Sequence, residues 1–399
     1  MQFDLATARA DTPGVAHVVH LNNAGASLAP RVVTEAMTAH LTLESTVGAY
    51  EAAERAQSAV GRAHHAVARL LGARSDEIAI VDSATRAWGL ALASIPLKAG
   101  DRVLVSPVEY GSNHLSLLHL AERTGVRLEF LPVDANGLVD PAALEQRLDD
   151  RVKLVAMAHV PMHDGLVNPV ARVGELVRRT DALFLVDACQ SVGQLPVDVR
   201  EIDCDLLVGC GRKYLRGPRG TGFLYVRSAV ADRLTPTVAG LDGIQWDAGG
   251  YRFAPGARRF ETWEANAAAR IGLGVAVDYA LGWGVERTWQ RIRTLAADLR
   301  ADLAAMPGVT VEDRGVERCG NVAVTFDGLD PFHVRGELLR AGINTWVCLD
   351  NAACQDMRQR GLSRLLRISV HYYNSESELE RLRCALDRLT TGSKATVFA

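Results

Sequence analysis

The amino-acid sequence predicts an α/β fold, with a mostly parallel seven-stranded sheet in a large domain and a smaller C-terminal α+β domain. Three observations lead to this fold class. Short β-rich apolar runs alternate with helical segments, several of these runs are apolar throughout, and the pattern restarts near residue 309 after a long helical stretch. Alternating strands and helices are typical of a parallel sheet covered by helices, and strands buried on both faces are continuously apolar.

The strands of the large domain are expected at regular intervals, separated by turn residues and helical periodicity. Their ranges are 77–81, 102–106, 127–133, 153–159, 183–187, 205–209 and 222–226. A helical stretch over 263–306 follows, and strands of the smaller domain are expected at 309–312, 321–326, 343–348 and 366–371. The large domain is predicted to span residues 17–284, and residues 285–399, joined by 1–16, form the small one.

The composition is that of an ordinary globular protein of enzyme size. The 399 residues carry a formal net charge of −3, and 48% of them are hydrophobic and 23% charged, which argues against disorder and against a role in binding nucleic acid. The most apolar long stretch, 268–283, is interrupted by Arg270 and Asp278 and is shorter than the roughly 20 residues of a membrane-spanning helix. The N-terminus lacks the basic and apolar regions of a signal peptide, so we expect a cytoplasmic location and no membrane partner.

The cysteines and histidines predict neither a disulfide framework nor a metal site. The sequence has seven cysteines without a CxxC pair, and such pairs are typical of zinc sites. His159 and His163 have a spacing that suits a metal on a helix, but they fall on a predicted strand and the loop after it, where residues four apart do not share a helical face. We therefore expect no metal.

Unusual polar residues follow three of the predicted strands. The first strand is followed by Asp-Ser-Ala-Thr-Arg at 82–86, a turn before a helix that can present backbone N–H groups to a phosphate. The fifth strand ends in Asp187, and Lys213 follows the sixth. Ligands of open α/β sheets bind beyond these carboxyl ends. Pyridoxal phosphate chemistry requires this combination, because the lysine forms a Schiff base and the carboxylate keeps the pyridine nitrogen protonated.

Three motifs carry a resemblance to a known family. They are VDACQSVGQLPVDV, CDLLVGCGRKYLRGPRGTGFLYV and RISVHYYNSESELERL. From about Leu21 to about Leu389, the chain resembles the class V aminotransferase group of fold-type I pyridoxal phosphate enzymes, which includes cysteine desulfurases, selenocysteine lyases, cysteine C–S lyases and isopenicillin N epimerase-like proteins. The resemblance implies pyridoxal 5′-phosphate as the cofactor, an amino acid as the substrate, and a homodimer with its active sites at the subunit interface.

The resemblance assigns the catalytic residues. Lys213 is the Schiff-base lysine, and Asp187 pairs with the pyridine nitrogen. Tyr110 falls where desulfurases place a histidine that stacks on the cofactor ring. A tyrosine can stack in the same way, but it is a poor proton shuttle near neutral pH.

Further cofactor contacts are implied near the strand ends and before the long helical stretch, at Ser83, Ala84, Thr85, Gln190, Cys210, Arg212 and Trp263. Gln190 would hydrogen-bond the phenolate oxygen or the region of the Schiff base. Cys210 and Arg212 replace a serine and a histidine of the desulfurases, and an arginine can fork onto a phosphate. Trp263, followed by Glu264, stands where the desulfurase partner subunit offers a Gly-Thr pair to the phosphate.

The resemblance also implies substrate contacts, at Asn22, Asn23, Ala24, His163, Trp346 and Arg367. Arg367 matches the arginine that binds the substrate α-carboxylate, an anion that suits a bidentate fork. Met162 or His163 takes the place of an asparagine that contacts the cofactor in relatives, which gives His163 a substrate-side role. Trp346 replaces the arginine of a Gly-Ile-x-x-Arg strand.

The segment after that strand bears on the reaction. Desulfurases carry a mobile cysteine there, but the aligned position is Asn351, with Cys348 and Cys354 nearby. We therefore expect a C–S lyase that cleaves cysteine or, in preference, a bulky cysteine S-conjugate by β-elimination, in specialised sulfur-containing metabolite biosynthesis. An aminotransferase, a decarboxylating oxidative deaminase and a persulfide-forming desulfurase stay open, as does a protein that keeps the cofactor for structure or regulation.

Overall fold

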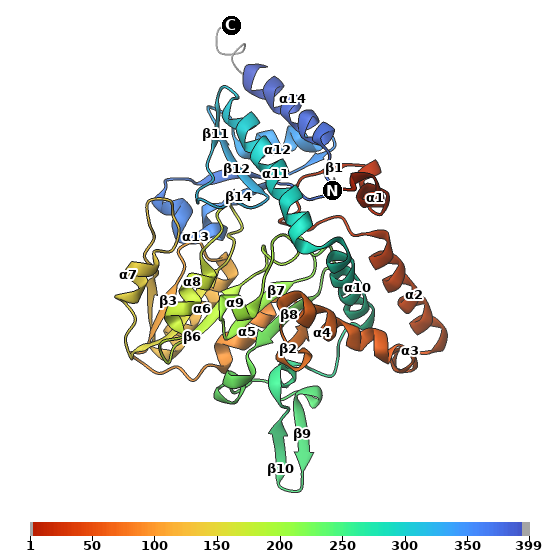
Figure 1. Cartoon of the computed structure of the whole chain (residues 1–399), viewed down its shortest axis with the longest axis vertical. Coiled ribbons are helices and arrows are strands. Elements are labelled where there is room, and N and C mark those ends of the chain that lie inside the picture. Colours follow the sequence, from red (N-terminus) through yellow and green to blue (C-terminus); the bar gives the residue numbers. More distant parts are fainter. Residues whose placement is uncertain (1–2, 393–399) are drawn as a thin grey trace.

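A seven-stranded sheet forms the centre of the larger part of the molecule (Figure 1). The computed structural model describes residues 3–392, and for residues 351–354 and 392 the backbone alone. The strand order is β2-β8-β7-β6-β5-β3-β4, and β8 is antiparallel to both of its neighbours while the other pairs are parallel. The prediction of a mostly parallel seven-stranded sheet is confirmed. The strands are Ile78–Val81 (β2), Arg102–Val105 (β3), Arg127–Phe130 (β4), Val152–Ala158 (β5), Leu183–Asp187 (β6), Leu206–Cys210 (β7) and Gly222–Val226 (β8).

Apolar side chains on both faces of this sheet pack against helices. In β6, Leu183 and Leu185 belong to one core cluster, and Phe184 and Val186 belong to the other. Because both faces are covered, the strand has no polar alternation. The helices of this part are Arg31–Val47 (α2), Ala49–Arg55 (α3), Gln57–Leu71 (α4), Ala84–Ser94 (α5), Gly111–Thr124 (α6), Pro141–Glu145 (α7), Val170–Val177 (α8), Val199–Ile202 (α9) and Ala267–Trp283 (α10).

A second, four-stranded antiparallel sheet forms the smaller part, at the top of Figure 1. Its order is β11-β12-β15-β14, with strands Val309–Val311 (β11), Asn321–Phe326 (β12), Trp346–Leu349 (β14) and Arg364–Ser369 (β15). The accompanying helices are Val285–Ala304 (α11), Pro331–Arg340 (α12), Asp350–Gln359 (α13) and Glu376–Gly392 (α14). The predicted α+β character of the C-terminal part is confirmed.

The N-terminal segment joins the two parts. Helix α1 (Leu5–Ala10) contacts the C-terminal part through Arg9, whose Nη1 lies 2.8 Å from Glu378 Oε1. Strand β1 (Val19–His20) pairs in parallel with β13 (Ile343–Asn344). The domain boundaries proposed from the sequence stay a prediction.

Three predicted elements end or break differently in the structure. The strand expected over 127–133 stops at Phe130, because Pro132 has no N–H for a strand ladder. The expected helical stretch over 263–306 is two helices, separated at Gly284, whose φ of 81° favours glycine. The strand expected over 343–348 is divided into β13 and β14, which pair with different strands.

A two-stranded hairpin that the sequence analysis did not predict projects from the bottom of the molecule in Figure 1. It consists of β9 (Ile244–Asp247) and β10 (Gly250–Phe253), with Trp246 opposite Tyr251. The remaining helical turns are short 3₁₀ helices at Pro13–Ala16, Ser75–Glu77, Ser228–Arg233, Leu241–Gly243 and Gly256–Phe260. Within residues 3–392, no helix has both the length and the apolar character needed to cross a membrane.

Candidate active site

A pocket lies beyond the carboxyl ends of β6 and β7, where the loops after β2 and β3 also arrive. It contains about 500 Å³ of empty space, its open mouth included. Of the residues predicted to contact the cofactor, it brings together Ser83, Ala84, Thr85, Tyr110, Asp187, Cys210, Arg212 and Lys213. Gln190 and Trp263 do not line it. The polar residues after the predicted strands therefore meet in one place, as their positions in a parallel sheet require.

The N-terminus of α5 forms one wall of the pocket. Ser83 is the N-cap residue, and its Oγ accepts a hydrogen bond from Arg86 N at 3.2 Å. Gly222 lies so close that a Cβ on it would be 2.5 Å from the carbonyl carbon of Ser83 and 2.6 Å from Ala84 N. The free N–H groups of a helix N-terminus attract anions, and Arg212, whose Nη1 donates to Gly25 O, lines the same pocket. This wall is suited to a phosphate group.

Asp187 ends β6 with both carboxylate oxygens hydrogen-bonded. Oδ1 accepts from Cys189 N at 2.8 Å, and Oδ2 accepts from Asn113 Nδ2 at 2.6 Å. Hydrogen bonds to the charged form favour ionisation of a carboxyl group. The same Asn113 Nδ2 donates to Glu109 Oε1 at 2.9 Å. Sequence reasoning missed Asn113 and Glu109, and the signal that could have found them is their spacing of four residues directly after a buried strand.

Lys213 follows β7 and is only 9% exposed. Its Nζ lies 5.9 Å from the centroid of the Tyr110 ring, so the lysine and the aromatic ring face the same space. The pocket also contains the thiols of Cys189 and Cys210. Of these two, the sequence predicted only Cys210 as a site residue. A hydrogen bond from Cys189, together with the charges of Lys213 and Arg212, lowers the pKa of the Cys210 thiol to about 6.

Residues 22–24 connect the pocket to the small sheet. Asn22 Oδ1 accepts from Arg367 Nη2 at 2.9 Å, whereas Asn23 is fully buried and its Nδ2 donates to Ser369 O at 2.7 Å. Ala24 O accepts from Gln190 Nε2 at 3.1 Å. The Gln190 amide nitrogen therefore holds the N-terminal segment, and its Oε1 is buried without a hydrogen-bond partner among the described residues.

Arg367 lies on β15 and is almost fully buried. Its Nη1 donates to Met162 O at 2.7 Å, and its Nε has no hydrogen-bond partner among the described residues. Trp346 on β14 is directly opposite Arg367 and is 44% exposed. Cys348, two residues further along β14, is buried with its Sγ 4.0 Å from Met162 O, and burial raises the pKa of this thiol. A guanidinium with a free donor thus stands beside an exposed aromatic surface.

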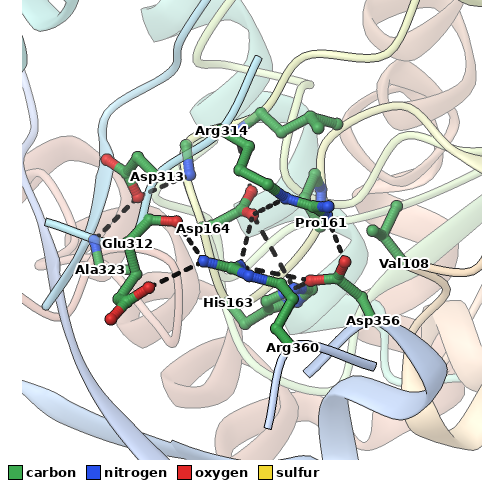
Figure 2. Close-up of polar contacts among 12 residues, drawn as sticks. Val108, Pro161, His163, Asp164, Glu312, Asp313, Arg314, Ala323, Asp356 and Arg360 are labelled. Carbon is green, nitrogen blue, oxygen red and sulfur yellow. Dashed lines mark hydrogen bonds and ion pairs between the residues drawn. The ribbon is translucent and has the colours of Figure 1, made fainter. Parts of the chain in front are cut away.

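His163, for which the sequence predicts a substrate-side role, does not line the pocket at Lys213 and lies in a buried cluster (Figure 2). Its ring is completely buried, and Nε2 lies 2.9 Å from Asp356 Oδ2 on α13. The Asp356 cluster consists of His163, Asp164, Glu312, Arg314, Asp356 and Arg360. The ring is enclosed by the loop after β5 and by α13, so it holds these two segments together instead of facing the pocket at Lys213.

Three members of the Asp356 cluster could be considered as metal ligands. His163, Asp164 and Asp356 hold ligand atoms within 4.8 Å of one another. The guanidinium groups of Arg314 and Arg360 already lie against these carboxylates. A cation would have to displace two paired charges, so we interpret the cluster as a buried ion-pair network.

Trp263 lies outside the pocket of its own chain. It precedes α10 and is 58% exposed. Glu264, the next residue, lines an adjoining cavity together with Arg86 and Arg270. The contact of Trp263 with a phosphate, which the sequence assigns to a partner subunit, stays a prediction.

Known proteins resemble this chain over almost its whole length. A family model described as Aminotransferase class-V matches residues 19–382. The chain is 30% identical to a probable cysteine desulfurase of Methanothermobacter thermautotrophicus, over 96% of this chain and 97% of that protein. It is also 30% identical to a cysteine desulfurase of Synechococcus elongatus, over 98% of this chain and 65% of that protein.

Solved structures show the same extent of likeness. The apo structure of cysteine desulfurase from Thermococcus onnurineus superposes with a TM-score of 0.91 at 27% identity, covering 98% of this chain and 99% of that one. The complex between the cystine C–S lyase C-DES and its reaction product cysteine persulfide has a TM-score of 0.85 at 25% identity, covering 94% of this chain and 99% of that one. Both the large and the small sheet are therefore shared.

The close approach of Gly222 to Ser83 gives a first test of the phosphate wall. We expect Gly222→Ala to weaken binding of pyridoxal phosphate by roughly tenfold or more, a loss of about 1.4 kcal/mol, because the new methyl group displaces the start of α5. Binding can be measured by fluorescence titration. Gly89→Ala is the matched control, since its Cβ meets nothing within 4 Å on the same helix. Unchanged affinity of a folded Gly222→Ala protein would move the phosphate elsewhere.

Proposed function

Because this chain belongs to the aminotransferase class-V family, we propose that it is a pyridoxal phosphate-dependent C–S lyase that acts on cysteine or, in preference, on a bulky cysteine S-conjugate by β-elimination. The predicted family, fold type and cofactor are confirmed by the family-model match and by the solved structures of relatives. The chain is thus a pyridoxal phosphate-dependent enzyme. The reaction and the substrate are the proposal.

The pocket fits the cofactor in its charge and its shape. The N-terminus of α5 and the Arg212 guanidinium suit the phosphate, and Gly222 leaves no side chain between β8 and that terminus. Lys213 and Asp187 face the same space from neighbouring strand ends. When bound there, pyridoxal phosphate supplies an electron sink for the α-carbon of an amino acid.

Three side chains of the pocket have distinct proposed roles. Asp187 accepts a hydrogen bond at each carboxylate oxygen and would pair with the protonated ring nitrogen. Lys213 Nζ would accept the proton from the α-carbon of the substrate as a general base. Tyr110 would form the wall against which the cofactor ring packs, because its own ring faces Lys213.

Arg367 supports recognition of an amino acid. Its guanidinium is fixed by Met162 O and Asn22 Oδ1, and Nε is left without a partner in the described part of the chain. A fixed, buried guanidinium with a free donor suits the α-carboxylate. Trp346 offers an apolar surface next to it, which supports a substituent on the sulfur.

The observation that carries the choice of reaction is the anchoring of the segment after β14. This segment is helix α13, and the Asp356 cluster fixes it to the loop after β5 (Figure 2). Asp356 N also donates to Pro107 O at 3.2 Å, which ties α13 to the loop that presents Tyr110. Cys348 is buried on β14. A thiol that has to reach the substrate needs a mobile segment, so this arrangement favours direct departure of the sulfur.

A persulfide-forming cysteine desulfurase is the second candidate. The names of the relatives in Methanothermobacter, Synechococcus and Thermococcus favour it. Cys354 would then be the sulfur acceptor, and its side chain lies outside the described residues. The product with free cysteine separates the two candidates, because a desulfurase leaves alanine whereas a β-elimination leaves pyruvate.

We also propose a homodimer in the cytoplasm, with the active sites at the interface. The hairpin of β9 and β10 projects alone from the molecule (Figure 1), and an isolated two-stranded hairpin is only marginally stable in water. Trp246 on this hairpin is 71% exposed, and Trp263 beside the pocket is exposed as well. Burial of these rings against a second copy would remove apolar surface from water.

The reaction can be tested on the purified holoenzyme by mass spectrometry of its products. With S-alkyl and S-aryl conjugates of cysteine, we expect pyruvate, ammonia and a free thiol in equal amounts, and with cysteine itself we expect hydrogen sulfide in place of the thiol. Lys213→Ala should lower turnover by roughly 10²–10⁴-fold, because the general base is lost.

The matched control is the double variant Cys348→Ser with Cys354→Ser, which should retain turnover if the thiol leaves directly. Alanine and an enzyme-bound persulfide, lost in this variant, would overturn the lyase in favour of the desulfurase. A keto acid or an aldehyde that keeps its C–S bond would point instead to transamination or to oxidative decarboxylation.

Carboxylate recognition can be tested with Arg367→Lys. We expect KM for the amino acid to rise by roughly 10–100-fold with a smaller change in kcat, because a charge-assisted bidentate contact of about 1.5–3 kcal/mol is lost. Arg335→Lys is the control, since Arg335 packs on the Trp346 ring at 5.0 Å but lies on α12. A KM that does not change would place the carboxylate at another group.

The dimer can be tested by light scattering of the holoenzyme. We expect the variant Trp246→Glu with Tyr251→Glu to dissociate toward the mass of one chain and to lose activity, because two charges would be buried at the interface. Val316→Glu is the control at a residue that is 81% exposed on the other part of the molecule. A wild-type mass of one chain would contradict the proposal.

A further inference from the structure

Glu109 is a completely buried carboxyl group that none of the roles above uses. It lies between β3 and α6, and its Oε1 accepts hydrogen bonds from Asn113 Nδ2 at 2.9 Å and from Tyr110 N at 3.1 Å. Its Oε2 is buried without a hydrogen-bond partner in the described part of the chain. None of the ion pairs found within residues 3–392 includes Glu109. A buried carboxylate without a cation is costly.

Its nearest charged group makes ionisation still more costly. Burial and the negative charge of Asp187 raise the pKa of Glu109 to about 8. Lys213, Cys189 and Cys210 influence the pKa values of the two thiols in the same pocket. The charge that shifts the pKa of Glu109 is that of Asp187. At neutral pH Glu109 is therefore the neutral acid, and the proton belongs on Oε2, because Oε1 already accepts two hydrogen bonds.

Asn113 connects the two carboxyl groups. Its Nδ2 donates to Asp187 Oδ2 at 2.6 Å and to Glu109 Oε1 at 2.9 Å, so both hydrogens of the amide are used. If the Asn113 amide were rotated by half a turn, its oxygen would face Asp187 Oδ2, and the Asp187 carboxylate would lose this hydrogen-bond donor. A neutral acceptor at Glu109 fixes the amide in the donating orientation without adding a second negative charge.

We propose that Glu109 is a positioning residue of the cofactor site: its Oε1 holds the Asn113 amide in the orientation in which Asn113 Nδ2 donates to Asp187 Oδ2. This inference rests on the proposed role of Asp187 toward the cofactor. Glu109 does not line the pocket, whereas Asn113 and Asp187 do. Glu109 therefore acts through Asn113 and does not touch substrate or cofactor.

The first experiment separates the donor from the residue that orients it. In the holoenzyme at pH 7, Asn113→Leu should weaken binding of pyridoxal phosphate by roughly tenfold or more and shift its absorption band, because a hydrogen bond to a charged group is lost. Glu109→Gln keeps a neutral acceptor in place, so its affinity and spectrum should match those of the wild type. Unchanged binding by Asn113→Leu would overturn the inference, and so would a spectrum of Glu109→Gln at pH 7 that matches Asn113→Leu.

The second experiment tests the protonation of Glu109 through stability. The folded chain keeps the Glu109 proton up to a higher pH than the unfolded chain, in which a glutamate has a pKa of about 4.3. The wild type therefore loses stability relative to Glu109→Gln as the pH rises from about 5 to about 8, and the difference then levels off. Unfolding midpoints of the two holoenzymes across this range measure the effect.

Glu129→Gln is the matched control for the pH series. The Arg102 guanidinium lowers the pKa of Glu129 through a hydrogen bond. The difference in unfolding midpoint between Glu129→Gln and the wild type should therefore stay constant over the same pH range. A flat difference for Glu109→Gln as well would overturn the inference. If Glu109→Gln does not fold, infrared spectra of wild-type enzyme with isotope-labelled glutamate give the answer, since the acid shows a protonated carboxyl band at pH 7 and the carboxylate does not.

A Lys213→Ala protein distinguishes the failure of this inference from the failure of the cofactor site. If Lys213→Ala and Asn113→Leu both leave the cofactor spectrum unchanged, the cofactor site itself is misassigned. If Lys213→Ala changes the cofactor spectrum but the stability of Glu109→Gln relative to the wild type does not rise with pH, only the role proposed for Glu109 is wrong.

Discussion

The whole site is built around Asp187, a carboxyl group that is almost completely buried and accepts a hydrogen bond at each of its oxygens. Asp187 ends the central strand β6, where the parallel register sets it beside Ala158 of β5 and Val208 of β7. In such surroundings electrostatic interactions are strong, and an unpaired charge is costly. Cys189 N and Asn113 Nδ2 offset that cost from two directions. The sheet thus sets the position of Asp187, and the loop after β6 and helix α6 supply its two hydrogen-bond donors.

The part of the site that is proposed to bind the substrate depends on a different constraint, the contact between the large and the small sheet. The N-terminal segment contacts both parts of the molecule: Asn22 and Asn23 bind Arg367 and Ser369 of the small sheet. Ala24 O and Gly25 O accept from Gln190 and Arg212 at the edge of the large sheet. This segment therefore links Arg367, the group proposed to bind the carboxylate, to residues of the pocket proposed to hold the cofactor.

The sequence predicted the buried part of this arrangement well, for a physical reason. Strands covered on both faces, such as β6 and β8, are continuous apolar runs, and the polar residues that follow them must lie at one edge of the sheet. The hairpin of β9 and β10 was missed because its residues are mostly exposed and lack that signal. Asn113 and His163 needed the tertiary structure, since each is defined by a partner far away in the sequence, Asp187 and Asp356.

The proposed direct departure of the sulfur from the substrate rests on the contacts that hold α13 in place. Burial opposes ionisation of Asp356, but the hydrogen bond from His163 and the charges of Arg314 and Arg360 lower its pKa overall, so the cluster is stable as a set of ion pairs. Breaking such a pair leaves a buried charge uncompensated. These contacts hold Asp356 of α13 against the loop after β5. Cys348 is buried, with its Sγ 4.0 Å from Met162 O. In the proposed reaction the released sulfur would therefore keep its own substituent, and the exposed Trp346 ring would be the surface that this substituent contacts. In this proposal the small sheet would recognise the leaving group, and the large sheet would provide the residues that activate the α-carbon.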